Sequence, residues 1–225
     1  MAQTREPQYQ RCLELNRTPL GLMTNQVWHD DPRRLTFVLA RYKFVSKMFS
    51  GLGRVLEVGC ADAFGSRLVQ QEVGSLTAVD FDPVFIEDVR SRMDARWPME
   101  CKMHDILEGP VAGDFDGAYA MDVLEHISPK DEDRFMTNMI LSLNPRGVLI
   151  LGMPSLESQA HASPPSREGH VNCKTGNALK ELGAKYFANV FVFSMNDEVV
   201  HTGFYPMAHY LIALCCGPMA PVQGR

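Results

Sequence analysis

The stretch Arg-Val-Leu-Glu-Val-Gly-Cys-Ala-Asp-Ala-Phe-Gly-Ser, from Arg54 to Ser66, decides the fold of this chain. Its apolar, β-branched start at residues 55–58 predicts a short buried strand. A turn of small residues follows at 59–63, and residues 64–72 are typical of a helix. A strand, tight turn and helix present backbone N–H groups to the polar end of a ligand, and small residues let that ligand approach the backbone.

Two acidic residues close the first two predicted strands. Glu57 ends the first, where a carboxylate would repel a pyrophosphate and suits a hydroxyl-rich, cationic or zwitterionic ligand. Residues 77–80 predict the second strand, and Asp80 at its end is placed to accept hydrogen bonds from both hydroxyls of a ribose. The pair therefore favours a nucleoside that carries an amino acid over a dinucleotide.

Glu57 and Asp80 resemble, in order and spacing, the first two motifs of class I S-adenosylmethionine-dependent methyltransferases, and the resemblance extends over about residues 55–154. The family usually shows Gly-x-Gly-x-Gly, whereas Ala61 and Ala63 stand here at the second and third positions. The resemblance implies a Rossmann-like, doubly wound α/β sheet of seven strands. We expect it to be mostly parallel, with the last strand antiparallel and inserted between the fifth and the sixth.

The apolar pattern predicts the other elements. Helices are expected over about residues 33–49, 84–96, 128–143 and 175–187. Strands are expected over about residues 99–103, 115–121, 148–153, 189–195 and 209–216.

The sequence predicts an N-terminal segment, a methyltransferase domain and, within that domain, a lid. Residues 1–32 should form an N-terminal flap or cap, irregular up to about residue 27, and residues 33–225 the methyltransferase domain. The polar segment 154–172 follows the fifth strand without a regular pattern, so it should overhang the site as a lid.

The resemblance implies S-adenosyl-L-methionine as the cofactor and a site built from the first four strands. Asp105 would accept a hydrogen bond from the exocyclic amine of the adenine, Ile106 would cover the ring, and Phe81 could stack on its face. A loop aspartate that caps a turn is the alternative for Asp105. The expected cofactor-binding residues are Glu57, Gly59, Cys60, Ala61, Asp80, Phe81, Asp105, Ile106, Met121, Asp122 and Tyr42.

Histidines are the expected groups that act on the acceptor, because their pKa suits proton abstraction near neutral pH. His161 and His170 lie in the 154–172 segment, and His126 ends the string Asp122-Val-Leu-Glu-His. That string resembles the Glu-x-x-Glu-His of quinone-biosynthesis O-methyltransferases, some of which hold a divalent ion nearby. With aspartate at the first position the likeness is partial, so we expect no metal ligands, although a divalent metal is possible. A solvated or packed histidine is the alternative for each.

The acceptor pocket is expected to include Trp28, His201 and Phe204. The alternative is that they are core or edge residues. The leading hypothesis is methyl transfer to a small molecule, as O-methylation of a hydroxyl on a sugar, polyketide or phenol.

Two other functions fit parts of the pattern. A nicotinamide-dependent oxidoreductase could use the same layered sheet, but Glu57 and the weak glycine motif count against it. A non-catalytic module that binds S-adenosylmethionine for regulation is the second, and the histidines of the 154–172 segment make it less attractive.

The composition of the chain indicates which binding partners and which location to expect. Lys+Arg 22 against Asp+Glu 27 gives a net charge of −5, and no basic run appears, so nucleic acid is not expected. No run reaches about 18 apolar residues and no apolar signal core begins the chain, so no membrane span is expected. The six cysteines form no C-x-x-C pair, which favours reduced thiols and a cytoplasmic location. The oligomeric state is left open, with a homodimer as one possibility.

Overall fold

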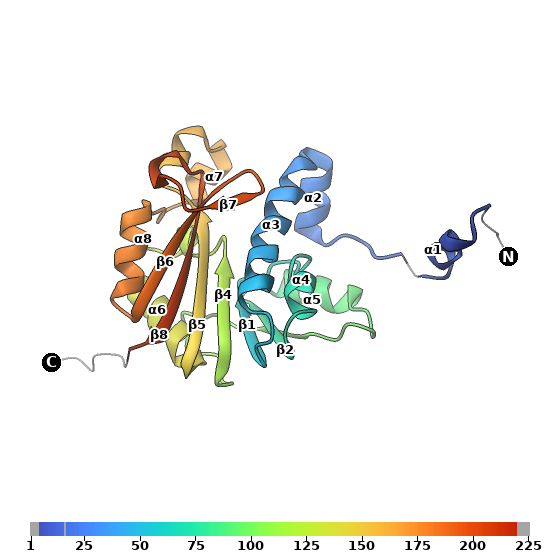
Figure 1. The fold of residues 1–225 in the computed structure, drawn as a ribbon, viewed down its shortest axis with the longest axis horizontal. Coiled ribbons are helices and arrows are strands. Elements are labelled where there is room, and N and C mark those ends of the chain that lie inside the picture. The colour runs from blue at the N-terminus through green and yellow to red at the C-terminus, as the bar shows by residue number, and fades with distance from the viewer. Residues whose placement is uncertain (1–4, 16, 220–225) are drawn as a thin grey trace.

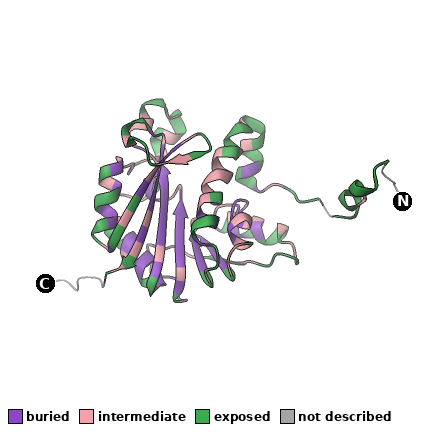
Figure 2. Ribbon diagram, viewed as in Figure 1, coloured by how far each residue is buried: buried purple, intermediate pink, exposed green. Residues whose placement is uncertain are grey.

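A computed structural model describes residues 5–15 and 17–219 of the chain. Its centre is one eight-stranded sheet with the strand order β3-β2-β1-β4-β5-β8-β6-β7. The strands are β1 (Arg54–Val58), β2 (Ser75–Asp80), β3 (Glu100–Met103), β4 (Phe115–Met121), β5 (Leu143–Pro154), β6 (Phe187–Asn196), β7 (Val199–His201) and β8 (Tyr210–Pro218). The strands are largely buried while the outer faces of the helices are exposed (Figure 2).

The sheet has the expected mixed character. The pairs β3–β2, β2–β1, β1–β4 and β4–β5 are parallel. The last strand, β8, lies between β5 and β6 and is antiparallel to both, as the resemblance implied. The expected number of seven strands was wrong by one, because the three-residue β7 folds back on β6 as an antiparallel edge strand.

Helices cover both faces of the sheet (Figure 1). On one face lie α3 (Arg33–Met48), α4 (Ser66–Gln70) and α5 (Pro83–Arg92), and on the other α6 (Glu132–Ser142) and α8 (Gly176–Ala184). Strand residues alternate between these two layers: Tyr119 packs with the α3 side, whereas Ala118 and Ala120 pack with the α6 and α8 side. This alternation builds the two cores and leaves the carboxyl ends of the parallel strands for a ligand.

The N-terminal segment differs from the expected irregular flap. It contains a 3₁₀ helix, η1 (Pro7–Tyr9), and two helices, α1 (Gln10–Glu14) and α2 (Leu22–Asp30), before α3 begins at Arg33 as predicted. The apolar side chains Met23 and Val27, one helical turn apart on α2, face the rest of the domain. Within the described ranges, no helix is long and apolar enough to cross a bilayer.

The 154–172 segment is also more regular than expected. After β5 it forms η3 (Glu157–His161) and α7 (Pro164–Gly169), and the Ser163 side chain caps α7 by accepting from the Ser166 N–H. Prolines 164 and 165 occupy the first turn of α7, where the missing N–H is not needed. In Figure 1, α7 and the tip at β7 stand over the same end of the sheet as α2. Two further 3₁₀ helices are η2 (Leu124–His126) and η4 (Tyr205–Met207).

The turn after β1 takes a strained path. Gly59 has φ +76°, and a Cβ there would lie 2.3 Å from Val123 Cγ2, so only glycine fits. Ala61 and Ala63, which stand where the family has glycines, have φ values of 45° and 50°. Left-handed backbone costs a residue with a Cβ about 1–2 kcal/mol. The loop therefore has the left-handed backbone typical of glycines, although alanines occupy two of its positions.

Replacing one of these alanines should relieve that strain. We expect Ala61→Gly to leave the free energy of unfolding unchanged or to raise it by up to about 1 kcal/mol, since the entropy of glycine in the unfolded chain offsets part of the gain. Ala118→Gly, in the buried middle of β4, is the control and should destabilise by about 1 kcal/mol. Urea denaturation measures both, and equal losses would contradict the strain at Ala61.

Candidate active site

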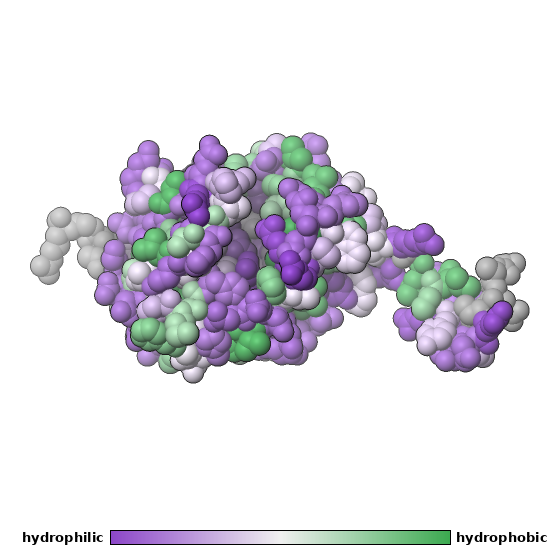
Figure 3. Space-filling model, turned by 90° about the horizontal axis from the view of Figure 1, so that it is seen from above, coloured by the Kyte–Doolittle hydropathy of each residue, from purple (hydrophilic) through white to green (hydrophobic). Residues whose placement is uncertain are grey.

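A cavity of about 670 Å³ opens at the carboxyl ends of the parallel strands. The surface is hollowed there when viewed down on this edge (Figure 3). Every expected cofactor-binding residue except Glu57 lines it, namely Tyr42, Gly59, Cys60, Ala61, Asp80, Phe81, Asp105, Ile106, Met121 and Asp122.

Asp80 shapes the loop as well as the cavity wall. Its Oδ2 accepts a hydrogen bond of 2.8 Å from the Ala61 N–H, and its Oδ1 accepts one of 3.0 Å from the Asp82 N–H. These bonds tie the turn after β1 to the end of β2. A carboxylate has about four acceptor sites, so Asp80 can accept two further hydrogen bonds from a ligand in the cavity.

Asp105 fits both interpretations given for it. Its Oδ1 accepts from the Leu107 N–H at 2.8 Å, which is the turn-capping role, and the residue also lines the cavity. Beside it, Ile106 is buried and Phe81 is exposed at the mouth. The cavity wall at the ends of β2 and β3 therefore combines one hydrogen-bond acceptor, Asp105, with apolar surface.

Glu57 lies beneath the cavity instead of in its wall. Its carboxylate is buried and accepts hydrogen bonds from the hydroxyls of Tyr42, at 2.9 Å, and Tyr119, at 2.8 Å. Tyr119 is its register partner on β4, so the two side chains leave the same face of the sheet. Burial raises the pKa of Glu57 to about 7, against the opposing hydrogen bonds of these hydroxyls. Glu57 thus supports Tyr42, which lines the cavity, and its expected contact with the ligand stays a prediction.

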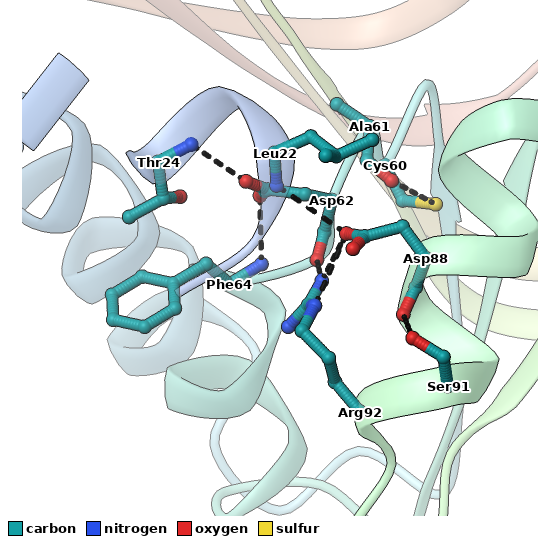
Figure 4. Close-up of polar contacts among 9 residues, drawn as sticks. All are labelled: Leu22, Thr24, Cys60, Ala61, Asp62, Phe64, Asp88, Ser91 and Arg92. Atoms are coloured by element: carbon teal, nitrogen blue, oxygen red, sulfur yellow. Dashed lines mark hydrogen bonds and ion pairs between the residues drawn. The ribbon is translucent and has the colours of Figure 1, made fainter. Parts of the chain in front are cut away.

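The helix α2 forms a wall that sequence reasoning missed. The Asp62 Oδ2 accepts from the Thr24 N–H at 2.7 Å, so a carboxylate from the turn after β1 caps the start of α2 (Figure 4). Arg92 braces this corner through the Asp62 carbonyl and the Asp88 carboxylate, both at 2.7 Å. The 4-residue spacing of Met23 and Val27 was the available signal for this helix.

A partly buried ion pair closes the side of the cavity at β4. The Arg41 guanidinium, from α3, binds the Asp122 carboxylate at 2.7 Å and lies 3.7 Å from the centre of the Tyr210 ring. Asp122 has φ +58°, which turns the chain sharply after β4. Burial first, and then Asp122, raise the pKa of Glu125 well above its usual range, while its own backbone N–H and Arg41 act in the opposite direction.

The structure brings two of the three expected histidines together. His126 lines the cavity, and its ring lies 5.1 Å from that of His170, centre to centre. Burial first, and His126 second, lower the pKa of His170. The third, His161, is exposed at the end of η3 and lines no part of the cavity.

The three expected acceptor residues lie outside the cavity. Trp28 is 55% exposed on α2, and Phe204 is 71% exposed before η4. Both ring nitrogens of His201 are used within the β6–β7 hairpin, by Asn196 Oδ1 and the Gly203 N–H, each at 2.9 Å. Periodicity and position after a strand could not show that these residues lie outside the cavity lining.

One model of a known protein family matches part of the chain. Residues 55–147 match the family model described as a methyltransferase domain. This region is a methyltransferase domain, and the chain has the fold of class I S-adenosylmethionine-dependent methyltransferases. A methyltransferase domain favours S-adenosyl-L-methionine over a nicotinamide as the cofactor.

Solved structures with the same fold span several kinds of methyltransferase. The N-methyltransferase NodS from Bradyrhizobium japonicum WM9 is 21% identical, with TM-score 0.62, over 84% of this chain and 99% of NodS. DhpI, solved with SAH, is 13% identical, with TM-score 0.64, over 87% of this chain and 91% of DhpI. The CurJ carbon methyltransferase is 14% identical, with TM-score 0.61, over 85% of this chain and 60% of CurJ. At these identities the likeness shows the fold alone. No curated protein sequence matches the chain.

The buried Glu57 carboxyl gives this methyltransferase a pH-dependent stability. Because its pKa is about 7 in the folded protein, against a usual 4.5, the folded state keeps a proton that the unfolded chain has lost between these values. Stability from this residue therefore falls as the pH rises through that window. We expect the free energy of unfolding to decline between pH 5 and pH 7 by about 2 kcal/mol more in the wild type than in Glu57→Gln.

Urea denaturation at both pH values measures the difference. Glu87→Gln, on the exposed side of α5, is the matched control and should keep the wild-type decline. Equal declines in the wild type and Glu57→Gln would show that Glu57 does not hold its proton.

Proposed function

We propose that the enzyme transfers the methyl group of S-adenosylmethionine to a hydroxyl of a small molecule. The observation that carries this proposal is the histidine pair: His126 lines the same cavity as Asp80, Met121 and Asp122, and the ring of His170 lies 5.1 Å from that of His126. A sulfonium is already an activated donor, so the protein has to align acceptor, methyl carbon and sulfur. A hydroxyl must also lose its proton as it attacks, and a neutral imidazole assists that loss.

The cofactor orientation in this proposal follows the lining residues. Asp80 accepts from the ribose hydroxyls, and Asp105 and Ile106 hold the adenine. The turn at Gly59 and Ala61 faces the methionine end, which directs the methyl group toward Met121 and Asp122. Glu57 supports this arrangement from below by fixing the Tyr42 hydroxyl.

The acceptor in this proposal has an apolar skeleton. Met23 and Val27 of α2 and Leu35 and Val38 of α3 line the cavity with aliphatic side chains. Such a wall suits a phenol or a polyketide better than a sugar, which needs many polar partners. The relatives NodS and CurJ methylate nitrogen and carbon by their names, so an acceptor screen must include amines and activated carbons.

We also propose a cytoplasmic location for the enzyme. The six cysteines of the chain are free thiols, with no disulfide among the described residues, and this supports the cytoplasm as the compartment.

Removing the Asp80 carboxylate tests the ribose assignment. We expect Asp80→Ala to weaken binding of S-adenosylhomocysteine by about 1–3 kcal/mol, because both ribose hydroxyls lose their acceptor. Isothermal titration calorimetry measures the affinity, and thermal unfolding checks that the loop tied by Asp80 still folds. Asp82→Ala, which removes the neighbouring carboxylate that caps α5, is the control. Unchanged affinity in a folded Asp80→Ala protein would refute the assignment.

Removing either member of the histidine pair tests the acceptor end. His126→Ala and His170→Ala should each reduce turnover about 10²-fold or more while leaving the affinity for S-adenosylhomocysteine unchanged. His161→Ala, an exposed residue of the same segment as His170, should keep wild-type turnover. Release of S-adenosylhomocysteine in a screen of hydroxylated aromatic compounds is the readout. Wild-type turnover in both pair variants would assign the proton transfer to another group.

A further inference from the structure

Three side chains with metal-binding atoms meet between the two histidine-lined hollows of the enzyme. One ligand atom from each of Glu125, His126 and His170 lies within 4.8 Å of the others. His126 lines the large cavity, and His170 lines a neighbouring hollow of about 360 Å³ under η3 and α7. The proposed acceptor end therefore contains a carboxylate and two imidazoles that converge on one point.

The carboxylate of Glu125 has no partner from another described residue. The residue is 1% exposed, and neither oxygen accepts a hydrogen bond from a neighbouring described side chain or backbone. The nearby cation, Arg41, is already engaged by Asp122 through both carboxylate oxygens, at 2.7 and 3.0 Å. A buried carboxylate without a donor or cation is costly, so this position calls for a positively charged or donating ligand.

Both imidazoles bond through Nδ1, and no described residue bonds to the Nε2 of either ring. The Nδ1 of His126 lies 2.9 Å from the Gly169 carbonyl, which can only accept, so this nitrogen carries the proton. The Nδ1 of His170 lies 2.9 Å from Gln159 Oε1, and Gln159 Nε2 donates to the Ser155 carbonyl, which fixes that amide. A histidine whose second nitrogen donates to an oxygen in this way is typical of metal sites.

The chain fixes His170 beside the other two residues. The Asn172 N–H donates to the Glu125 carbonyl at 3.0 Å, and the Asn172 side chain donates to Glu132 Oε2 at 2.9 Å. Lys174 pairs with the same Glu132 carboxylate at 2.5 Å. The three donors are thus brought together by the fold before any ligand binds.

We propose that Glu125, His126 and His170 bind one divalent transition-metal cation of the zinc type at the acceptor end of the cavity. Two imidazoles and one carboxylate leave a coordination position for a further ligand, as in catalytic zinc sites. The imidazole-rich set suits Zn²⁺ or Co²⁺ better than Mg²⁺, which prefers oxygen ligands. Asp122 occupies the first position of the string that resembles Glu-x-x-Glu-His, but it is paired with Arg41. His170, from the 154–172 segment, takes its place among the three ligands.

The role of this cation rests on the proposed function, because the cation would act on the same acceptor hydroxyl. A bound divalent cation lowers the pKa of a hydroxyl that coordinates it, so the histidine pair would act on the acceptor through the metal. It would also join η2 to the end of the 154–172 segment, because its ligands come from both.

The test is metal binding to the intact protein, measured without turnover. Protein dialysed against a chelator is titrated with Zn²⁺ by calorimetry and with Co²⁺ by visible absorption. We expect one equivalent to bind, with the spectrum of nitrogen and oxygen ligands and no thiolate band. Glu125→Gln and His170→Ala should each weaken Zn²⁺ binding at least tenfold, and His161→Ala should bind as the wild type does. His170 is only partly buried, so its variant should fold even if Glu125→Gln does not.

Three results would overturn the proposal: no stoichiometric binding to the wild type, a thiolate band that assigns the ion to a cysteine, or wild-type affinity in both ligand variants. Titration with S-adenosylhomocysteine on the metal-free protein separates the two proposals. Binding of that nucleoside without zinc binding would remove the cation and keep the methyl transfer. Zinc binding without nucleoside binding would remove the proposed cofactor geometry and keep the metal site.

Discussion

The hydrogen bond from the Ala61 N–H to the Asp80 carboxylate is the contact on which the site depends. It holds the turn after β1 against the end of β2, and it does so although Ala61 must adopt left-handed backbone to make it. The same turn carries Asp62, whose carboxylate caps α2. One short loop therefore fixes the floor of the cavity and, through α2, one of its walls. A shift of that loop would move both together.

The parts of the fold that sequence predicted are those with a local cause. The strand β4 was predicted at its observed bounds, because an apolar run between turn residues specifies a buried strand. Asp80 and Asp105 could be placed because the carboxyl ends of parallel strands share one edge. The helix α2 was missed because only Met23 and Val27 mark the side that lines the cavity, and its capping group, Asp62, comes from a distant loop.

The position of a polar side chain within the site is less predictable than its presence. Glu57 ends a strand as expected, yet Tyr42 and Tyr119 donate to it from below, so it supports the cavity from outside. No periodicity encodes this, since each partner comes from another element. The pairing of His126 with His170 likewise depends on a hydrogen bond from His126 to Gly169, 43 residues away. Trp28 and Phe204 are exposed and line no part of the cavity, so their expected contact with the acceptor stays a prediction.

The charges after β4 explain why one carboxylate is left for a ligand. Arg41 is the cation that α3 brings to this corner, and its guanidinium lies over the Tyr210 ring while it pairs with Asp122. Asp122 takes both of the short contacts, so Glu125, only three residues on, keeps two oxygens without a donor from any other residue that the structure describes. A buried acid in that state either holds a proton or meets a cation. The two neighbouring imidazoles make the second outcome chemically available, because a cation shared among three ligands satisfies the carboxylate without an additional protein charge.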